Sequence, residues 1–270
     1  MLSLDQEVVK TIGILSIATN HYVDYWGKMV LSAQKTLFPN FEVKFHVFTD
    51  QPESVEDFVH KNSVIGVVVH PIPTLGWPEA TLFRYRVYFE HASQLQEDIL
   101  MHLDADMVIN DSAEFLLKDF NWTTGMLLVK HPGFYRPSRL VDLYKLYLSD
   151  PILFTKDCYR RIRFGGIGSW ETNPNSQAFV LRKNRSVYVC GGAWLGYRHS
   201  FLKMIEKLSM QVDQDLGDNY IAKWHDESHL NFWNSQNDCI LINPTLCHDN
   251  SYSYLKAIKP TITAVNKNAE

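Results

Sequence analysis

Short apolar runs alternate with helical patterns through the first 110 residues of this 270-residue chain, and that alternation limits its fold more than any other feature. Four runs are predicted strands, at 12–18, 45–50, 64–69 and 99–104. Two stretches between them, 22–35 and 81–96, carry apolar side chains at helical spacing. Strands that alternate with helices predict an α/β fold, with a mostly parallel central sheet and helices on both of its faces.

The second half of the chain is less regular. Residues 141–148 and 201–211 have helical patterns, whereas 177–181 and 186–190 are predicted strands. Residues 136–169 end in a glycine cluster, which is typical of a mobile loop. No internal repeat or Ser/Pro-rich linker divides the chain, so we expect one domain over 1–270.

Composition and charge exclude several classes of protein. The formal net charge is -4, which argues against an extended basic surface for nucleic acid. No apolar run reaches the roughly 18 residues of a membrane span. Asp5 and Glu7 precede the first apolar stretch, where a secretion signal would be basic, and we therefore expect a soluble, cytoplasmic protein. The four cysteines include no CxxC pair, which argues against a zinc ribbon.

Two carboxylates, Asp104 and Asp106, flank Ala105 where the fourth predicted strand ends. The carboxyl ends of parallel strands are where ligands bind in α/β sheets. Two carboxylates at such a position suit a hard divalent cation that also keeps water or phosphate oxygens as ligands. The pair therefore predicts a metal site, although a polar loop at a strand end would look the same.

A second cluster lies at 223–231 and contains two imidazoles, two carboxylates and Trp224 within nine residues. In a helix His225 and His229 would lie one turn apart, a spacing that can bind zinc. A zinc hydrolase of that kind carries its glutamate directly after the first histidine, but here Asp226 takes that place and Glu227 follows. A zinc-dependent hydrolase is thus one alternative, and a sugar-binding protein without turnover is another.

Two further segments are candidate site walls. Pro and Gly force a turn in the sequence HPGFY at 131–135, which would present His131 beside two aromatic rings. The predicted strand at 189–196 contains Gly191 and Gly192, and glycine inside a strand often allows close approach of a ligand or of another element.

Together and in this order, these motifs resemble glycosyltransferase family 6, which includes the histo-blood-group A and B transferases and the α-1,3-galactosyltransferases. The resemblance covers residues 12–267. It rests on the sequences FTDQ, DADM, HPGFY, SQA and WHDESHLN at 48–51, 104–107, 131–135, 176–178 and 224–231. It implies a GT-A-type fold with a Rossmann-like sheet, a UDP-sugar donor, Mn²⁺, and transfer with retention of configuration. Residues 1–110 would form the nucleotide-binding half and 111–270 the acceptor-binding half.

The resemblance also implies roles for individual residues. Glu227 would be the nucleophile or an ion-pair stabiliser of the transition state, and Asp226 would hold the donor sugar. Because both carboxylates of the DxD motif are present, Asp104 and Asp106 would bind the metal. Acceptor contacts would come from His131, Ser169, Trp224 and Glu227. Donor contacts would come from Ile17, Ala18, Tyr22, Arg84, Asp104, Cys190, Gly191, Gly192, Asp226 and Lys267.

Cys190 and Gly192 match the two positions that choose between galactose and N-acetylgalactosamine. A glycine at the second position leaves room for an acetamido group, which favours UDP-GalNAc over UDP-Gal. The expected reaction is α-1,3 transfer of GalNAc or Gal to an oligosaccharide with a terminal β-galactose, plain or fucosylated at O2.

Overall fold

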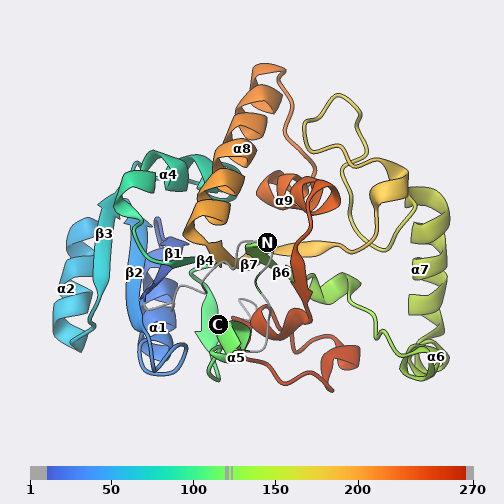
Figure 1. Ribbon diagram of the computed structural model, residues 1–270, viewed down its shortest axis with the longest axis horizontal. Helices are drawn as coiled ribbons and strands as arrows, with labels where there is room; N and C mark the ends of the chain where they lie inside the picture. The colour runs from blue at the N-terminus through green and yellow to red at the C-terminus, as the bar shows by residue number, and fades with distance from the viewer. Residues whose placement is uncertain (1–10, 119–121, 123, 266–270) are drawn as a thin grey trace, which may run out of the picture.

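The computed structural model describes residues 11–118, 122 and 124–265. Its centre is a seven-stranded sheet with the order β3-β2-β1-β4-β7-β6-β8 (Figure 1). Only β7 runs against the other six strands. The strands are β1 (Thr11–Ile17), β2 (Glu42–Thr49), β3 (Val67–Pro71), β4 (Ile99–Leu103), β6 (Met126–Lys130), β7 (Val189–Tyr197) and β8 (Ile240–Ile242). A separate antiparallel pair joins β5 (Met107–Ile109) to β9 (Ile262–Ala264).

Helices cover both faces of this sheet, as predicted. In Figure 1, α4, α8 and α9 lie above the sheet and α1 and α5 lie below it. The helices are α1 (Tyr22–Ala33), α2 (Pro52–Asn62), α3 (Glu79–Leu82), α4 (Arg84–Glu90), α5 (Phe115–Lys118), α6 (Leu140–Ser149), α7 (Pro151–Phe164), α8 (Arg198–Gly217) and α9 (His225–Gln236). The mixed α/β architecture is therefore the one expected of a GT-A-type fold.

Alternating side chains of the central strands fill a core on each face. On β1, Ile12 and Ile14 point to the layer of α1, where Trp26 is buried, and Leu15 points to the layer of α4 and α8. Because both faces are covered, β1 has no polar face: residues 12–16 are all buried, and the hydroxyl of Ser16 donates to the carbonyl of Leu103 at 2.6 Å. This explains why the sequence signal of the strand was clear.

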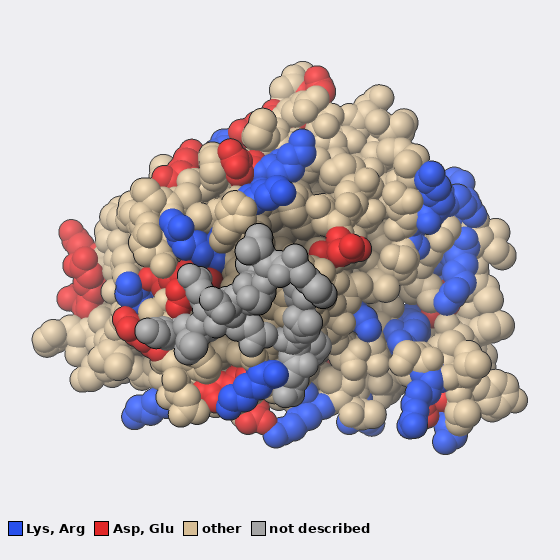
Figure 2. Space-filling view, viewed as in Figure 1, with Lys and Arg blue, Asp and Glu red and all other residues tan. Residues whose placement is uncertain are grey.

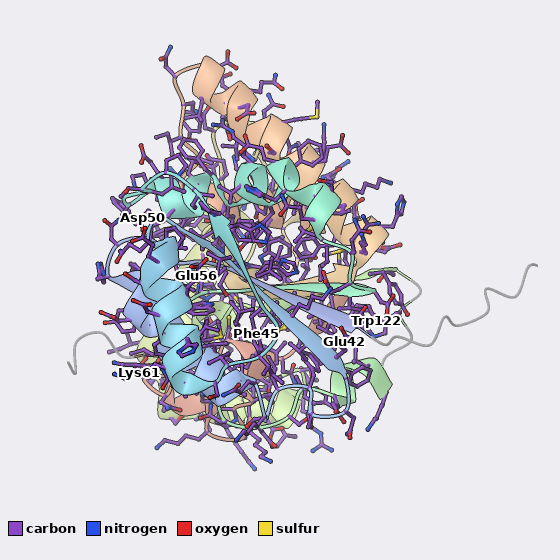
Figure 3. The ribbon with its side chains drawn as sticks, turned by 90° about the vertical axis from the view of Figure 1, so that its left-hand side faces the viewer. Glu42, Phe45, Asp50, Glu56, Lys61 and Trp122 are labelled. Carbon is purple, nitrogen blue, oxygen red and sulfur yellow. The ribbon has the colours of Figure 1, made fainter. Side chains whose placement is uncertain are left out.

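The parallel strands end at one edge of the sheet. Figure 3 looks onto the β3 side with α2 in front, and Glu42 and Asp50 mark the two ends of β2. Asp104 follows β4 at the same edge, since β4 is parallel to β1 and β1 to β2. The antiparallel β7 begins near this edge, and the Asp104 N–H donates to the carbonyl of Gly192 at 3.0 Å. Strand direction thus brings the glycines of β7 against the DxD motif.

Three predictions about local structure were wrong. Residues 177–181 form turns and loop where a strand was expected. The predicted helix at 81–96 is divided into α3, α4 and a short 3₁₀ turn. The predicted helix at 141–148 is present as α6, but the rest of 136–169, expected to be a loop, also contains α7. The Asp150 carboxylate caps α7 by accepting the N–H of Leu153 at 2.8 Å, and Pro151 occupies its first turn.

Within the residues that the structure describes, no helix has the length and apolar character needed to cross a bilayer.

Candidate active site

A pocket of about 440 Å³ opens at the carboxyl edge of the sheet, between β4, β7 and the start of α9. It gathers residues from the DADM, HPGFY and WHDESHLN motifs and from the glycines of β7. Its lining is Trp77, Thr81, Arg84, Asp104, His131, Phe134, Ser169, Gly191, Gly192, Trp224, His225, Asp226 and Glu227. Nine of these were predicted as site residues: Arg84, Asp104, His131, Ser169, Gly191, Gly192, Trp224, Asp226 and Glu227.

The buried guanidinium of Arg84 joins three elements behind the pocket. Its Nη2 lies 3.0 Å from Oδ1 of Asp104, and its Nη1 lies 3.2 Å from Oδ2 of Asp226. The same Nη1 donates to the carbonyl of Gly191 at 2.9 Å. Burial alone would lower the pKa of Arg84, but Asp226 and Asp104 raise it above its ordinary value, so the side chain stays charged.

His102 supports Arg84 from within β4. Its Nε2 lies 2.7 Å from Nη1 of Arg84, and because a guanidinium only donates, this nitrogen must accept. The ring proton then sits on Nδ1 and points to the hydroxyl of Tyr88 at 2.8 Å. Burial, with Arg84 adding to it, lowers the pKa of His102 to about 4, which keeps the ring neutral. The pocket floor thus carries one cation and no second positive charge from this histidine.

Both carboxylate oxygens of Glu227 are held in place. Oε2 accepts the N–H of Gly191 at 2.9 Å, and Oε1 accepts the hydroxyl of Tyr188 at 2.8 Å. The side chain is one-fifth exposed and faces the pocket. Burial raises the pKa of Glu227 to about 7, although both hydrogen bonds oppose the rise. A fixed, weakly solvated carboxylate at a pocket wall is suited to stabilise or attack a developing positive centre.

Asp226 lies on the first turn of α9, next to Glu227. Its carboxylate is buried against Arg84, and its carbonyl accepts the hydroxyl of Tyr85 at 3.0 Å. Burial raises the pKa of Asp226 to about 7 and Arg84 limits that rise. The turn starts at His225 with a φ of 43°, a left-handed conformation that non-glycine residues seldom adopt. This conformation at the first residue of α9 fixes the direction in which the helix starts, and with it the positions of Asp226 and Glu227.

Gly191 and Gly192 let these carboxylates approach β7. A Cβ on Gly191 would lie 3.0 Å from Oδ2 of Asp226, and one on Gly192 would lie 2.9 Å from Oδ2 of Asp104. Side chains at either position would therefore push against the acidic groups of the pocket. The glycines serve close packing of the site itself, in addition to any room they leave for a ligand.

The opposite wall of the pocket is aromatic. Nδ1 of His131 accepts the N–H of Gly133 at 3.0 Å, so its proton is on Nε2, which lies 4.0 Å from Oε2 of Glu227. Burial lowers the pKa of His131 to about 4, and the ring is neutral at neutral pH. Trp224 is half-exposed, and its indole N–H donates to the hydroxyl of Ser169. Exposed aromatic faces beside fixed hydroxyl and imidazole groups are suited to bind a sugar ring.

The two histidines of the zinc alternative have different partners. Nδ1 of His225 lies 3.2 Å from the hydroxyl of Thr81, and its ring packs edge-on against Trp77. His229 is fully buried, with Nε2 3.6 Å from Asp215 on α8. Among the described residues no three His, Cys, Asp or Glu side chains form a group that could bind a metal by themselves. A zinc site completed by a third protein ligand therefore finds no support at these histidines.

The remaining predicted donor residues lie outside the pocket lining. Ile17 ends β1, Ala18 follows it and Tyr22 begins α1, all at the same carboxyl edge. Cys190 is buried in β7, where its thiol faces that of Cys247. Asp106 is partly exposed two residues after Asp104. Lys267 lies outside the described residues.

Several residues of the site were not predicted. Trp77 and Thr81 come from the segment around α3, Tyr188 directly precedes β7, and His102 lies within β4. Trp77 is 83% exposed, which is unusual for tryptophan, but sequence alone does not reveal exposure. Their roles depend on contacts between distant elements, and no local motif marks them.

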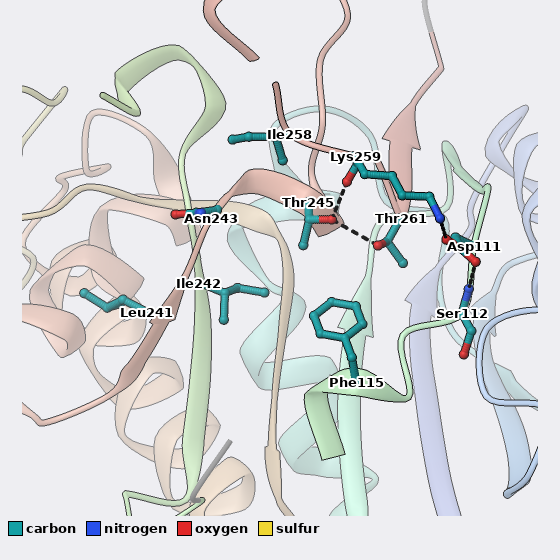
Figure 4. A pocket seen from close by; sticks show the side chains of 10 residues that line it. All are labelled: Asp111, Ser112, Phe115, Leu241, Ile242, Asn243, Thr245, Ile258, Lys259 and Thr261. Carbon is teal, nitrogen blue, oxygen red and sulfur yellow. Dashed lines mark hydrogen bonds and ion pairs between the residues drawn. The ribbon is translucent and has the colours of Figure 1, made fainter. Parts of the chain in front are cut away.

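A second hollow lies between β8 and the segment around 258–261 (Figure 4). Its polar groups are already paired with one another. The hydroxyl of Thr245 donates to the carbonyl of Lys259 at 2.7 Å and lies 3.0 Å from that of Thr261. Asp111 forms an ion pair with Lys259. None of the predicted site residues lines this hollow, so the chemistry belongs to the first pocket.

Comparison with known proteins agrees with this geometry. The profile described as Glycosyltransferase family 6 matches residues 3–144 and 166–270. The chain is 26% identical over 253 residues to the O-antigen biosynthesis glycosyltransferase WbnI of Escherichia coli, covering 92% of each chain. It is 26% identical over 226 residues to the histo-blood group ABO system transferase 1 of Rattus norvegicus. It is 23% identical, also over 226 residues, to the globoside alpha-1,3-N-acetylgalactosaminyltransferase 1 of Gallus gallus. These last two alignments cover 82% of this chain and 56% of each relative.

Replacing Arg84 tests its role in the buried site. We expect Arg84→Met to lower the free energy of unfolding by about 3–5 kcal/mol, because it leaves buried carboxylates without their counter-charge. Adding Asp226→Asn should restore part of this loss, since it removes one of those carboxylates. Urea unfolding of both variants and of Asp226→Asn alone measures the coupling. Losses that simply add would show that Arg84 and Asp226 do not interact.

The raised pKa of Glu227 predicts a pH dependence of stability. The folded chain holds this proton more tightly than the unfolded chain, so the free energy of unfolding should fall as pH rises from about 4.5 to about 7. Glu227→Gln cannot ionise and should reduce this fall, while the exposed control Glu90→Gln should keep it. Urea unfolding at several pH values measures both. Equal slopes for Glu227→Gln and the wild type would contradict the raised pKa.

Proposed function

This chain belongs to glycosyltransferase family 6, and we propose that it transfers GalNAc or Gal from a UDP-sugar to a β-galactoside, forming an α-1,3 linkage with retention of configuration. The acceptor is an oligosaccharide with a terminal galactose, plain or fucosylated at O2. One observation carries the proposal. A single pocket brings Asp104, Asp226 and Glu227 together behind an aromatic wall, from motifs more than 100 residues apart.

The named relatives support the sugar chemistry. One is described as an O-antigen biosynthesis glycosyltransferase and another as an α-1,3-N-acetylgalactosaminyltransferase. Both names fit an enzyme that extends a glycan. In this chain residues 1–110 would bind the nucleotide, through Ile17 and Ala18 after β1 and Tyr22 at the start of α1, and residues 111–270 would bind the acceptor. Lys267 would contact the diphosphate.

Asp104 and Asp106 would hold Mn²⁺. Both are partly exposed carboxylates at the end of β4, and oxygen ligands of this kind suit a hard cation that completes its shell with water and phosphate. Arg84 donates a hydrogen bond to Oδ1 of Asp104, and the other oxygen, Oδ2, lies next to Gly192. When bound, the ion would offset negative charge that develops on the departing UDP.

Glu227 would act at the anomeric carbon. Gly191 and Tyr188 fix both of its oxygens, so little reorganisation is needed when positive charge develops on the sugar. Whether the carboxylate attacks or forms an ion pair, it must be ionised, and its raised pKa makes it a stronger base than a solvated glutamate. Asp226, oriented by Arg84, would bind donor-sugar hydroxyls beside it.

The acceptor would stack on Trp224 and donate or accept hydrogen bonds at His131 and Ser169. The Nε2–H of neutral His131 points toward Glu227 and can donate to an acceptor oxygen. An acceptor bound here would present its reacting hydroxyl next to the carboxylate wall. This arrangement positions the two substrates, which can account for a large share of a transfer rate.

UDP release tests the proposal directly. We expect release from UDP-GalNAc and UDP-Gal to be stimulated by 2′-fucosyllactose in Mn²⁺ and to stop in EDTA. Asp106→Asn and Glu227→Gln should each lower turnover by at least about 100-fold, because the first weakens the Mn²⁺ site and the second removes the negative charge that faces the anomeric carbon. The exposed carboxylate Asp111, changed to Asn, serves as control.

The outcomes separate the alternatives. UDP release that continues in EDTA would show that Asp104 and Asp106 do not bind an essential metal. Acceptor binding without any UDP release would favour a non-catalytic sugar-binding protein. Hydrolysis that depends on zinc and on His225 would restore the hydrolase interpretation.

Gly192 adds a test of donor choice. The sequence comparison favours UDP-GalNAc, because glycine leaves room for an acetamido group. In the structure a Cβ at this position lies 2.9 Å from both Asp104 Oδ2 and Met107 Cε. We therefore expect Gly192→Ala to lower kcat/KM for both donors and to raise the Mn²⁺ concentration needed for activity. Unchanged metal dependence with a shift toward UDP-Gal would instead show that Gly192 acts only on the donor sugar.

A further inference from the structure

Helices α6 and α7 expose an unusual number of large apolar side chains. Each of these side chains is at least 48% exposed. On most soluble proteins, exposed large apolar side chains occur singly rather than in such a group. They are Leu140, Val141, Tyr144 and Leu148 on α6, and Ile152, Phe154, Tyr159 and Ile162 on α7. The family profile leaves residues 145–165 unmatched, so five of these eight residues lie outside the part of the chain that the profile matches.

Three of the exposed apolar side chains of α7 form one outward stripe. Ile152, Tyr159 and Ile162 are separated by seven and three residues, which places them on one face of the helix together with Thr155. Asp157 lies on the opposite face and is buried. The stripe therefore points directly away from the body of the protein.

The same arrangement occurs on α6. Leu140, Tyr144 and Leu148 are four residues apart and exposed, while Leu146 on the far side of the helix is its buried position. Both helices are thus amphipathic in the reverse sense, because the apolar stripe faces solvent. Neither helix propensity nor packing against the core of this protein explains an apolar stripe that faces solvent. Binding to an apolar surface outside the protein would explain it.

This segment is also strongly basic. Residues 136–164 contain seven Lys and Arg and three Asp, a net charge of +4. The whole chain has a net charge of -4, so the other residues together carry -8. Figure 2 shows Lys and Arg gathered on the right-hand side of the molecule, where α6 and α7 lie in Figure 1. Lys145 on α6, and Lys156 and Arg163 on α7, flank the apolar stripes.

The two helices are fixed to the wall of the active-site pocket. The buried carboxylate of Asp157 accepts hydrogen bonds from Arg136, Tyr147 and Arg160. The guanidinium of Arg160 lies 5.1 Å above the ring of Phe134, which lines the pocket. A surface bound by α6 and α7 would therefore keep a set orientation relative to the pocket.

We propose that α6 and α7 dock the protein onto a bilayer that contains anionic phospholipid. Apolar stripes enter the boundary between headgroups and acyl chains, and flanking Lys and Arg side chains reach the phosphates. Charge complementarity selects this partner over a second copy of the chain, because pairing two copies of this face would juxtapose two segments of +4. The surface lies apart from the acidic pocket, so this proposal does not depend on the sugar that the enzyme transfers.

Vesicle flotation tests the proposal with the whole chain. The probe is vesicles of phosphatidylcholine with about a quarter phosphatidylglycerol, compared with phosphatidylcholine alone. We expect the wild type to float with the anionic vesicles, less so at high salt. The double variant Ile152→Ser, Ile162→Ser should bind at least about ten-fold more weakly, because two apolar side chains no longer enter the interface.

Matched controls separate docking from unfolding. Ile65 and Met210 are 77% and 61% exposed away from this segment, and changing both to Ser should leave flotation unchanged. The double variant Lys156→Gln, Arg163→Gln should bind the anionic vesicles more weakly than the wild type, and its binding should depend less on salt. Equal thermal midpoints would show that the variants are folded.

Two results would overturn the proposal. One is a wild type that does not float with anionic vesicles, or a double Ile variant that floats as well as the wild type does. The other is a dimer, seen by light scattering, that the double Ile variant dissociates without any binding to vesicles. The surface would then be a contact between copies of this chain.

Discussion

The buried charge of Arg84 is the constraint on which the site depends. A guanidinium away from water must be paired, and its partners here come from three elements: Asp104 after β4, Gly191 in β7 and Asp226 at the start of α9. Each pairing fixes one wall of the pocket relative to the others. The charge therefore holds the two acidic motifs at one place, although more than 100 residues separate them.

The direction of β7 places Gly191 and Gly192 next to the acidic residues. If β7 ran parallel to β4, its first residues would lie at the far edge of the sheet, away from the DxD motif. Because β7 is antiparallel, Leu103 pairs with Ala193, and the two preceding glycines reach the carboxyl edge. The absence of side chains there lets Asp104, Asp226 and Glu227 share a small space. Burial raises the pKa of both α9 carboxylates, and the nearby charge of Asp104 adds to the rise.

How far the sequence predicts this protein depends on whether a signal is local. Strands β1, β2 and β4 were predicted because each is a short apolar run, and the carboxylates were predicted because they form motifs. Helix α7 was missed because the glycine cluster that directly follows it indicated a loop. Tyr188 and His102 were missed because their roles come from distant partners. The direction of β7 is likewise set by tertiary pairing, and no residue pattern within the strand encodes it.

The attachment of α6 and α7 bears on how such an enzyme could diversify. A buried carboxylate, Asp157, holds the pair to the segment at 136, while Arg182 and Arg185 bind carbonyls at the end of α7. None of these contacts includes a strand of the central sheet. The pair is thus attached through loops rather than through the sheet, so changes on its outer surface need not disturb the strands and the start of α9 that hold the acidic groups. Where the enzyme works and what it transfers to can then change independently of how it transfers.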